Sequence, residues 1–287
     1  YNPKDWITFI FRFHKSDTFR TLTPMMILIG VYSGLIAYLE IEFWQLSENS
    51  HVKNLTIMHT TVGFVLSLLL AYRTNTAYDR WWEGRKAWGS SVNDSRSLSA
   101  KLSALKLEKE VKHKFSSLII LYAFSVKNHL RNKLIQDDAD YTIDLSRSHL
   151  TGHQPLRVQQ ELRAAIEEIR NNNQMSPECW LATQRDLDGL VASLGICERI
   201  KNTPIPFSYS LFIKKFIFIY VVTMPLAFVP LFGYLSAFIS TFVFYALVSM
   251  ELLAEEIEDP FGGDENDLPT DQICLTIQNN SQQIFGA

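Results

Sequence analysis

Four stretches without Asp, Glu, Lys or Arg constrain this chain more than any other feature of its sequence. They are Thr21–Leu39, Asn54–Tyr72, Phe216–Gly233 and Tyr234–Met250. Each is close to the length that a helix needs to cross a bilayer core of roughly 30 Å. Average composition hides them, since 20% of all residues are charged. A soluble protein that buries four apolar helices is the alternative, but soluble cores need no such repeated runs. We therefore expect an all-α integral membrane protein with four transmembrane helices.

Basic residues flank the four runs unevenly, and this asymmetry predicts the orientation. Lysine and arginine cluster before the first run, after the second and before the third. Between the first two runs Lys53 is the only lysine or arginine, and the junction at Gly233 has no charged residue. Basic loops remain on the cytosolic side of a membrane. We expect a multi-pass protein of the cell membrane, with both termini and the middle section in the cytosol.

The runs divide the chain into four parts. Residues 1–73 hold an N-terminal segment and the first two runs, and residues 74–210 form a polar cytosolic region with helical periodicity. Residues 211–260 hold the last two runs. Residues 261–287 form a cytosolic tail, whose polar composition predicts irregular structure.

Individual helices are predicted within the polar region. Leu118–Arg131 and Val158–Arg170 have amphipathic spacing. Ser176, followed by proline and glutamate, is typical of a helix N-terminus, and the helix is expected to continue through about Ile200. Gln136–Pro155 is rich in Asp, Ser, Gly and His and is expected to be a loop.

The second run carries an apolar stripe. Phe64, Leu68 and Tyr72 are spaced four residues apart, so the stripe rises about 12 Å along a helix. Packing or lipid contact explains such a stripe by periodicity alone. Several copies around a symmetry axis would instead form a dry constriction, which gates by excluding water. Gly63 lies on an adjacent face and allows close helix contact, whereas Ile29 of the first run is expected to face lipid.

The segment after the stripe resembles a known family. Arg73–Arg85 reads RTNTAYDRWWEGR, and this pattern at the end of an apolar helix is similar to the bestrophin family, in its bacterial and plant-related branch. Cys197–Tyr209 resembles that family's approach to its third membrane segment, and Glu258–Pro269 resembles its acidic stretch after the fourth. Order and spacing agree over nearly the whole chain.

The resemblance implies a homopentameric ring around one axial pore that conducts small ions. The second run would line the pore within the membrane. Counting along the family motif places an apolar neck on Phe64, Leu68 and Tyr72, and a cytosolic aperture on Ile205, which precedes Pro206. The family neck usually holds Ile and Phe, so Tyr72 departs from it by bringing a hydroxyl group to the inner rim.

The sign of the permeant ion is less constrained. A neck of Phe, Leu and Tyr has no formal charge, so vestibule charges must decide, and Asp79 and Glu83 are the first candidates. Acidic lining favours cations, whereas arginine or helix N-termini favour anions. The resemblance implies chloride and other small anions. A monovalent-cation channel of the same architecture is the alternative.

One metal site is considered and disfavoured. Asp264 and Asp267 offer oxygen ligands for Ca²⁺, at the place where the resemblance to animal bestrophins implies a calcium site. Gly263 and Asn266 replace acidic residues there, so a solvated turn before Pro269 is favoured over calcium.

No other cofactor is expected. His149 and His153 are four residues apart, but Thr-Gly lies between them and we expect no metal site there. The sequence has no nucleophile elbow, HExxH, P-loop or paired-cysteine motif, which argues against a membrane-anchored enzyme. The net charge of −3 gives no indication of nucleic-acid binding. Membrane lipid, permeant ions and further copies of this chain are the expected partners.

Overall fold

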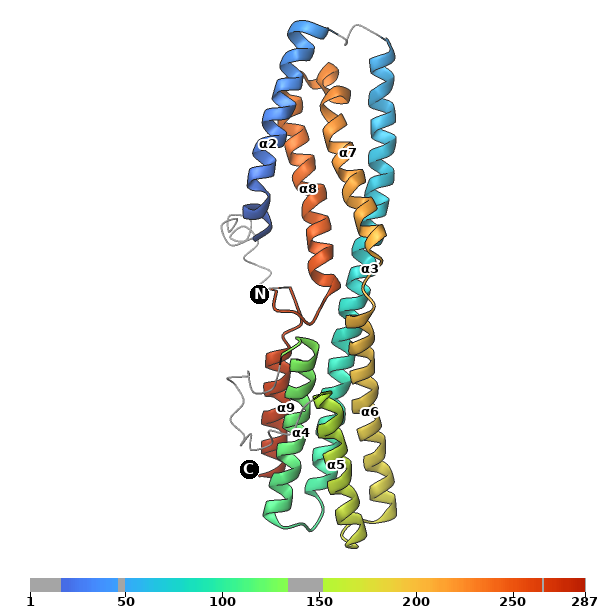
Figure 1. The fold of residues 1–287 in the computed structure, drawn as a ribbon, viewed down its shortest axis with the longest axis vertical. Helices are drawn as coiled ribbons and strands as arrows, with labels where there is room; N and C mark the ends of the chain where they lie inside the picture. The colour runs from blue at the N-terminus through green and yellow to red at the C-terminus, as the bar shows by residue number, and fades with distance from the viewer. Residues whose placement is uncertain (1–16, 46–49, 134–151, 265, 287) are drawn as a thin grey trace, which may run out of the picture. The chain divides into compact units, whose positions relative to one another are not determined.

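The computed structural model describes residues 17–45, 50–133, 152–264 and 266–286, and within these ranges all regular structure is helical. The chain forms two compact units (Figure 1). The first comprises the described residues of Tyr1–Tyr78 and Ile205–Glu258, and the second those of Asp79–Pro204 and Asp259–Ala287. The unit boundaries lie a few residues from the boundaries expected at 73, 210 and 260.

The first unit contains the four apolar runs, and a separate helix forms nearly all of each run. Its elements are α2 (Asp17–Leu39), a short π-helix η3 (Glu40–Trp44), the first part of α3 (Ser50–Ser103), α7 (Phe207–Phe232) and α8 (Leu235–Glu258). Helix α8 lies against α2 and α7, and α2 also contacts α7. Among the described residues, four helices are long and apolar enough to cross a membrane, which confirms the expected membrane architecture.

The helices of the first unit meet in a small apolar core. Leu66 and Leu70 of α3 pack against a group contributed by α7 and α8: Ile213, Ile217, Tyr220, Val221 and Phe244. A Cβ atom at Gly63 would lie 2.5 Å from the Tyr220 hydroxyl oxygen, so glycine permits this close approach of α3 to α7. The close contact expected at Gly63 is confirmed.

Much apolar surface faces outward from the first unit. Leu28 and Val31 of α2, Phe218 of α7 and Phe238 of α8 are all largely exposed. Such surface is stable against lipid, because hydrocarbon tails are as apolar as these side chains. Ile29 differs from the expectation, because it packs against the apolar core of its own unit.

Two features of α7 and its end agree with the sequence. The helix continues through Pro225 and Pro230, as a spanning helix can. It ends at Gly233, whose φ of 54° is in the left-handed region that favours glycine. Helix α8 begins two residues later, so α7 and α8 form a tight antiparallel pair.

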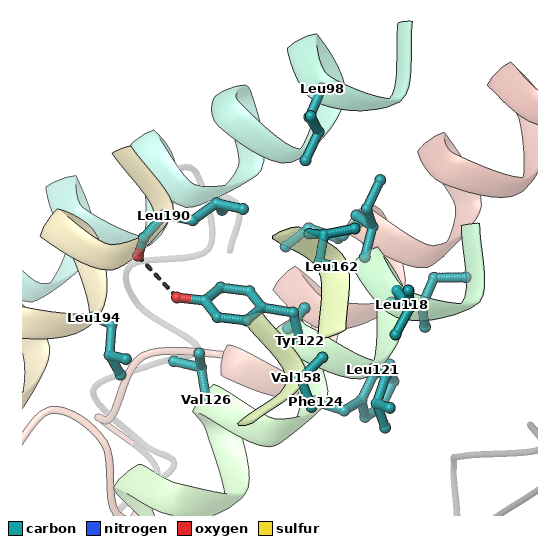
Figure 2. Packing of buried hydrophobic residues seen from close by; sticks show 14 of the residues in the cluster. Leu98, Leu118, Leu121, Tyr122, Phe124, Val126, Val158, Leu162, Leu190 and Leu194 are labelled. Atoms are coloured by element: carbon teal, nitrogen blue, oxygen red, sulfur yellow. Dashed lines mark hydrogen bonds between the residues drawn. The ribbon is translucent and has the colours of Figure 1, made fainter. Parts of the chain in front are cut away.

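The second unit is a helical bundle around α4. It contains the rest of α3, α4 (Lys109–Leu130), α5 (Gln154–Asn171), α6 (Pro177–Asn202) and α9 (Thr270–Phe285), and α4 contacts α5, α6 and α9. Figure 2 shows Tyr122 of α4 among the buried side chains, with its hydroxyl donating to the Leu190 carbonyl at 2.9 Å. Leu118, Phe124 and Leu162 are fully buried in the same core.

Several local expectations are confirmed and others are wrong. Ser176 caps α6 by accepting from the Cys179 backbone N–H at 3.2 Å, as predicted. Helix α5 buries one face, as expected of an amphipathic helix.

Helix α4 differs from the expected amphipathic helix, because every residue from 118 to 128 is buried against neighbouring helices. Pro155 lies in the first turn of α5 rather than in a loop, and most of the expected loop lies outside the described residues.

The prediction that the C-terminal tail is irregular is wrong. Residues 270–285 form helix α9, which packs on α4. Ile273, Cys274 and Ile277 are buried on one face, and the Cys274 thiol donates to the Ala123 carbonyl at 3.4 Å. Three apolar residues at helical spacing are enough to form this contact, although glutamine and asparagine surround them.

Candidate pore-lining site

The predicted neck stripe lies on the outer face of α3. Successive residues of a helix are rotated by about 100°, which places Phe64, Leu68 and Tyr72 roughly opposite Leu66 and Leu70. The two leucines are buried, whereas the stripe side chains are 65%, 45% and 66% exposed. One chain therefore presents the stripe away from its own helices, where it encloses no channel by itself.

A buried arginine follows the stripe directly. Arg73 is 1% exposed, and its Nη2 donates to Glu258 Oε2 of α8 at 2.7 Å. Its Nε lies 3.6 Å from Oε1 of Glu251, which precedes Glu258 by about two turns of the same helix. A buried charge needs a partner of opposite sign because its hydration is lost. These ion pairs fix the inner end of the stripe against α8.

Glu258 also holds the predicted aperture residue. Its second oxygen, Oε1, accepts from the backbone N–H of Ile205 at 2.7 Å. Pro206 follows at the N-cap of α7, and Ile205 is half-buried. One carboxylate therefore links Arg73, next to the neck, with Ile205. Sequence reasoning missed this link, although an acid at the end of an apolar helix was a usable signal.

The two vestibule candidates have different surroundings. Asp79 is exposed. Glu83 forms an ion pair with Arg199 of α6, and its side chain is partly exposed while that of Arg199 is largely exposed. The arginine reduces the field of Glu83, so Asp79 is the stronger candidate for an acid that acts on a passing ion.

The side chain of Arg80 contacts the end of α6. Its guanidinium donates to the carbonyls of Ile200 and Thr203, at 2.6 Å each. These carbonyls lie in the last turn and at the C-cap of α6, where carbonyls need donors from outside the helix. Arg80 thus closes the C-terminal end of α6.

The acidic turn brings Asp264 and Asp267 together. Asp267 Oδ2 accepts from the Asp264 backbone N–H at 2.7 Å, while Oδ1 is buried without a hydrogen bond. Burial raises the pKa of Asp267 to about 6. Two carboxylates supply fewer than the six to eight oxygens that Ca²⁺ takes, so carbonyls or water would have to complete a site. Calcium binding here stays a prediction.

The comparisons with known proteins concern nearly the whole chain. The family model described as bacterial/fungal bestrophin protein matches residues 2–283. A voltage-dependent anion channel-forming protein of Nostoc sp. is 36% identical over 227 residues, which cover 76% of this chain and 74% of the relative. The voltage-dependent anion channel-forming protein YneE of Escherichia coli K12 is 29% identical over 276 residues, which cover 95% and 89%.

Solved structures agree with the fold. Two single-site variants of a bacterial bestrophin homologue from Klebsiella pneumoniae are each 27% identical to this chain. One superposes with a TM-score of 0.84 over 93% of this chain and 100% of the other. The second has a TM-score of 0.81 over 91% and 99%.

Proposed function

Because the chain belongs to the bacterial and fungal bestrophin family, we propose that it forms a ring of identical subunits and conducts small anions such as chloride along the ring axis. One observation carries the proposal: Phe64, Leu68 and Tyr72 form an uncharged, exposed stripe opposite the core-facing side of α3. Relatives named as anion channel-forming proteins support the sign of the ion.

The ring follows from the single stripe in each subunit. One helix cannot enclose a pore, whereas closed cyclic symmetry brings identical stripes to a common axis. Five subunits is the number implied by the family resemblance. In such a ring the three side-chain layers form a narrow apolar neck that excludes water until it widens. The Tyr72 hydroxyl makes the inner layer the easiest to hydrate.

Ile205 is proposed as a second constriction. Its backbone is biased toward an extended conformation by the following proline and is held by Glu258. A ring of isoleucine side chains strips part of an ion's hydration shell, so weakly hydrated anions should pass more easily. Asp79, an exposed acid, is the observation that favours the alternative of a cation channel.

The remaining parts of the proposal concern placement and chemistry. We place both termini and the second unit on the cytoplasmic side of the cell membrane, because lysine and arginine flank the spans on that side. We propose that ion passage requires no catalytic cycle. Lipid contacts the exposed apolar faces of α2, α7 and α8.

A reversal-potential measurement tests the proposal. Purified protein in a planar bilayer, under a KCl gradient, should give currents that reverse near the chloride equilibrium potential. Reversal near the potassium potential would establish the cation channel instead. Assembled protein that carries no current would contradict both, and native mass spectrometry would report the number of subunits.

A further inference from the structure

Three side chains that can ligate a metal meet in the second unit, each from a different helix. His129 lies in the last turn of α4, His153 is the N-cap of α5, and Glu198 lies near the end of α6. Glu198 Oε1 accepts from His129 Nε2 at 2.8 Å and from His153 Nε2 at 2.6 Å. The ring centroids are 4.3 Å apart. One carboxylate oxygen therefore gathers two imidazole nitrogens.

This donor set matches the preference of zinc. Two histidines and one glutamate are the protein ligands of a known class of zinc site, in which water takes the fourth position. The three donor atoms lie within 4.8 Å of one another. A tetrahedral ion with bonds of about 2.1 Å needs ligand atoms about 3.4 Å apart. Each nitrogen must therefore move roughly 0.6–0.8 Å from the oxygen, a shift that side-chain rotation provides.

The surroundings permit an ion to enter. The three side chains are between 26% and 34% exposed, so solvent reaches the cluster. Lys201 is a nearby cation, and its Nζ donates to the His129 carbonyl at 2.8 Å and to Asn132 Oδ1 at 2.6 Å. Its charge is held by these acceptors, although it lowers the affinity for a second cation.

Metal binding changes the hydrogen bonding in a defined way. Each neutral imidazole that binds through Nε2 carries its proton on Nδ1. His153 Nδ1 now accepts from the Leu156 backbone N–H at 3.4 Å. The ion therefore replaces two hydrogen bonds to Glu198 and this long capping bond with three coordinate bonds.

We propose that His129, His153 and Glu198 bind one transition-metal ion per subunit, with Zn²⁺ the best match. The ion clamps the adjoining ends of α4, α5 and α6. The acidic turn at Asp264 and Asp267 is a different kind of site, because its all-oxygen donors suit Ca²⁺. The proposal uses contacts within the second unit alone and does not depend on the ion that the protein conducts.

Equilibrium dialysis of the full chain in detergent tests the proposal. After treatment with a chelator, the protein should bind one Zn²⁺ per subunit at this site, and Co²⁺ should give the visible absorption of a tetrahedral complex. His153→Gln and Glu198→Gln should each weaken binding at least about tenfold and remove the Co²⁺ spectrum. Glutamine keeps a hydrogen-bonding side chain at either position. His113→Gln is the matched control, because His113 is an exposed histidine of the same α4.

The outcomes distinguish the proposal from its competitors. Equal Zn²⁺ binding by the wild type, His153→Gln and Glu198→Gln would overturn it. Loss of binding in Asp267→Asn, with no loss in His153→Gln, would place the ion at the acidic turn and also overturn it. If a variant does not fold, the effect of Zn²⁺ on the melting temperature of the wild type tests the proposal instead. Zn²⁺ should raise the melting temperature of the wild type and of Asp267→Asn by several degrees, and no shift with Zn²⁺ would reject the site.

Discussion

In the first unit a few charged side chains are buried beside the apolar core and large apolar side chains cover the outer faces, whereas the second unit buries most of its apolar side chains and carries most of its ion pairs at the surface. Arg73 and Glu251 are buried among the helices of the first unit, while Leu28 and Phe238 face outward. In the second unit Leu118 and Phe124 fill the core, and pairs such as Arg163–Asp188 lie at the surface. The solvent explains the difference, because exposed apolar area is unfavourable in water but not in lipid.

The contrast affects how exposure is interpreted. In the second unit an exposed apolar residue needs a partner or is an isolated surface residue. In the first unit, exposure is shared by residues that contact lipid and residues that line a pore. Leu28 and Leu68 are both exposed, yet only Leu68 belongs to the proposed neck. Exposure does not distinguish pore-lining residues from lipid-facing residues, so mutations must be used to distinguish them.

The largest effect is expected from breaking the buried ion pairs of the first unit. Arg73→Met removes the cation and leaves Glu251 and Glu258 without it, which should lower the free energy of unfolding by roughly 3–5 kcal/mol. Thermal unfolding in detergent measures the loss. Lys214→Met is the matched control, because Lys214 pairs with Glu255 at the surface and should change stability by about 0–1 kcal/mol. Equal losses would mean that burial does not distinguish the two pairs.

The core of the second unit should show a smaller but clear loss. Leu162→Ala leaves a cavity in a fully buried site of α5 and should lower the free energy of unfolding by about 2–4 kcal/mol. Leu181→Ala, at an exposed position of α6, should change it by less than about 0.5 kcal/mol. Denaturant unfolding compares them. Similar values would show that the second unit lacks a tightly packed core.

Local pattern predicts much of the first unit and less of the second. The apolar runs are long enough to identify their helices without tertiary information. Ile29 was placed wrongly because a run that is apolar on all sides does not show which side meets its neighbours. Helix α9 was missed because only Ile273, Cys274 and Ile277 mark its buried face, and α4 supplies most of the reason for it to fold.

The candidate sites differ in the same way, because some of their residues follow from local sequence and others only from tertiary contacts. The neck stripe follows from spacing within one helix, so sequence reasoning found it, and its role in a pore stays a prediction. The link from Arg73 through Glu258 to Ile205 joins residues far apart in the chain. His153 was considered with His149, four residues away, whereas Glu198, which it contacts, is 45 residues away. His149 lies outside the described residues.

The neck itself is tested by current rather than by stability. Leu68→Ala should widen and hydrate the constriction, raising single-channel current or open time, with little change in unfolding because the side chain is exposed. Leu28→Ala is a better control than a change at Ile29, since Leu28 faces outward from α2. A similar change in current from both variants would remove the distinction between pore and lipid surfaces.

The aperture and the vestibule should affect selectivity separately. Ile205→Ala should change the permeability ratios among halides without reversing the preferred sign. Asp79→Asn should shift the anion-to-cation ratio, and Glu83→Gln should shift it less because Arg199 already pairs with Glu83. Reversal potentials in NaCl and mixed-halide gradients measure both. A reversal of sign by Ile205→Ala, with no effect from either acid, would contradict this division.

The smallest effect concerns Asp267, a partly buried acid of the second unit that accepts from a backbone N–H rather than from the close cation that Glu258 has. Burial raises its pKa from 3.8 to about 6. The folded state therefore binds a proton more tightly than the unfolded state between these values. Its contribution to stability is greatest below pH 4 and is lost as the pH rises through 6.

Asp267→Asn should accordingly flatten the dependence of melting temperature on pH between about 4 and 7. Asp264→Asn is the comparison variant: it keeps the backbone N–H that donates to Asp267 and removes only a nearby negative charge, so it should lower the pKa of Asp267 without abolishing the pH dependence. If Ca²⁺ binds at this turn, it requires the ionised carboxylate, so any rise in melting temperature with Ca²⁺ should fade below pH 6 and be absent in Asp267→Asn. A pH profile that Asp267→Asn leaves unchanged would show that the titration comes from another group.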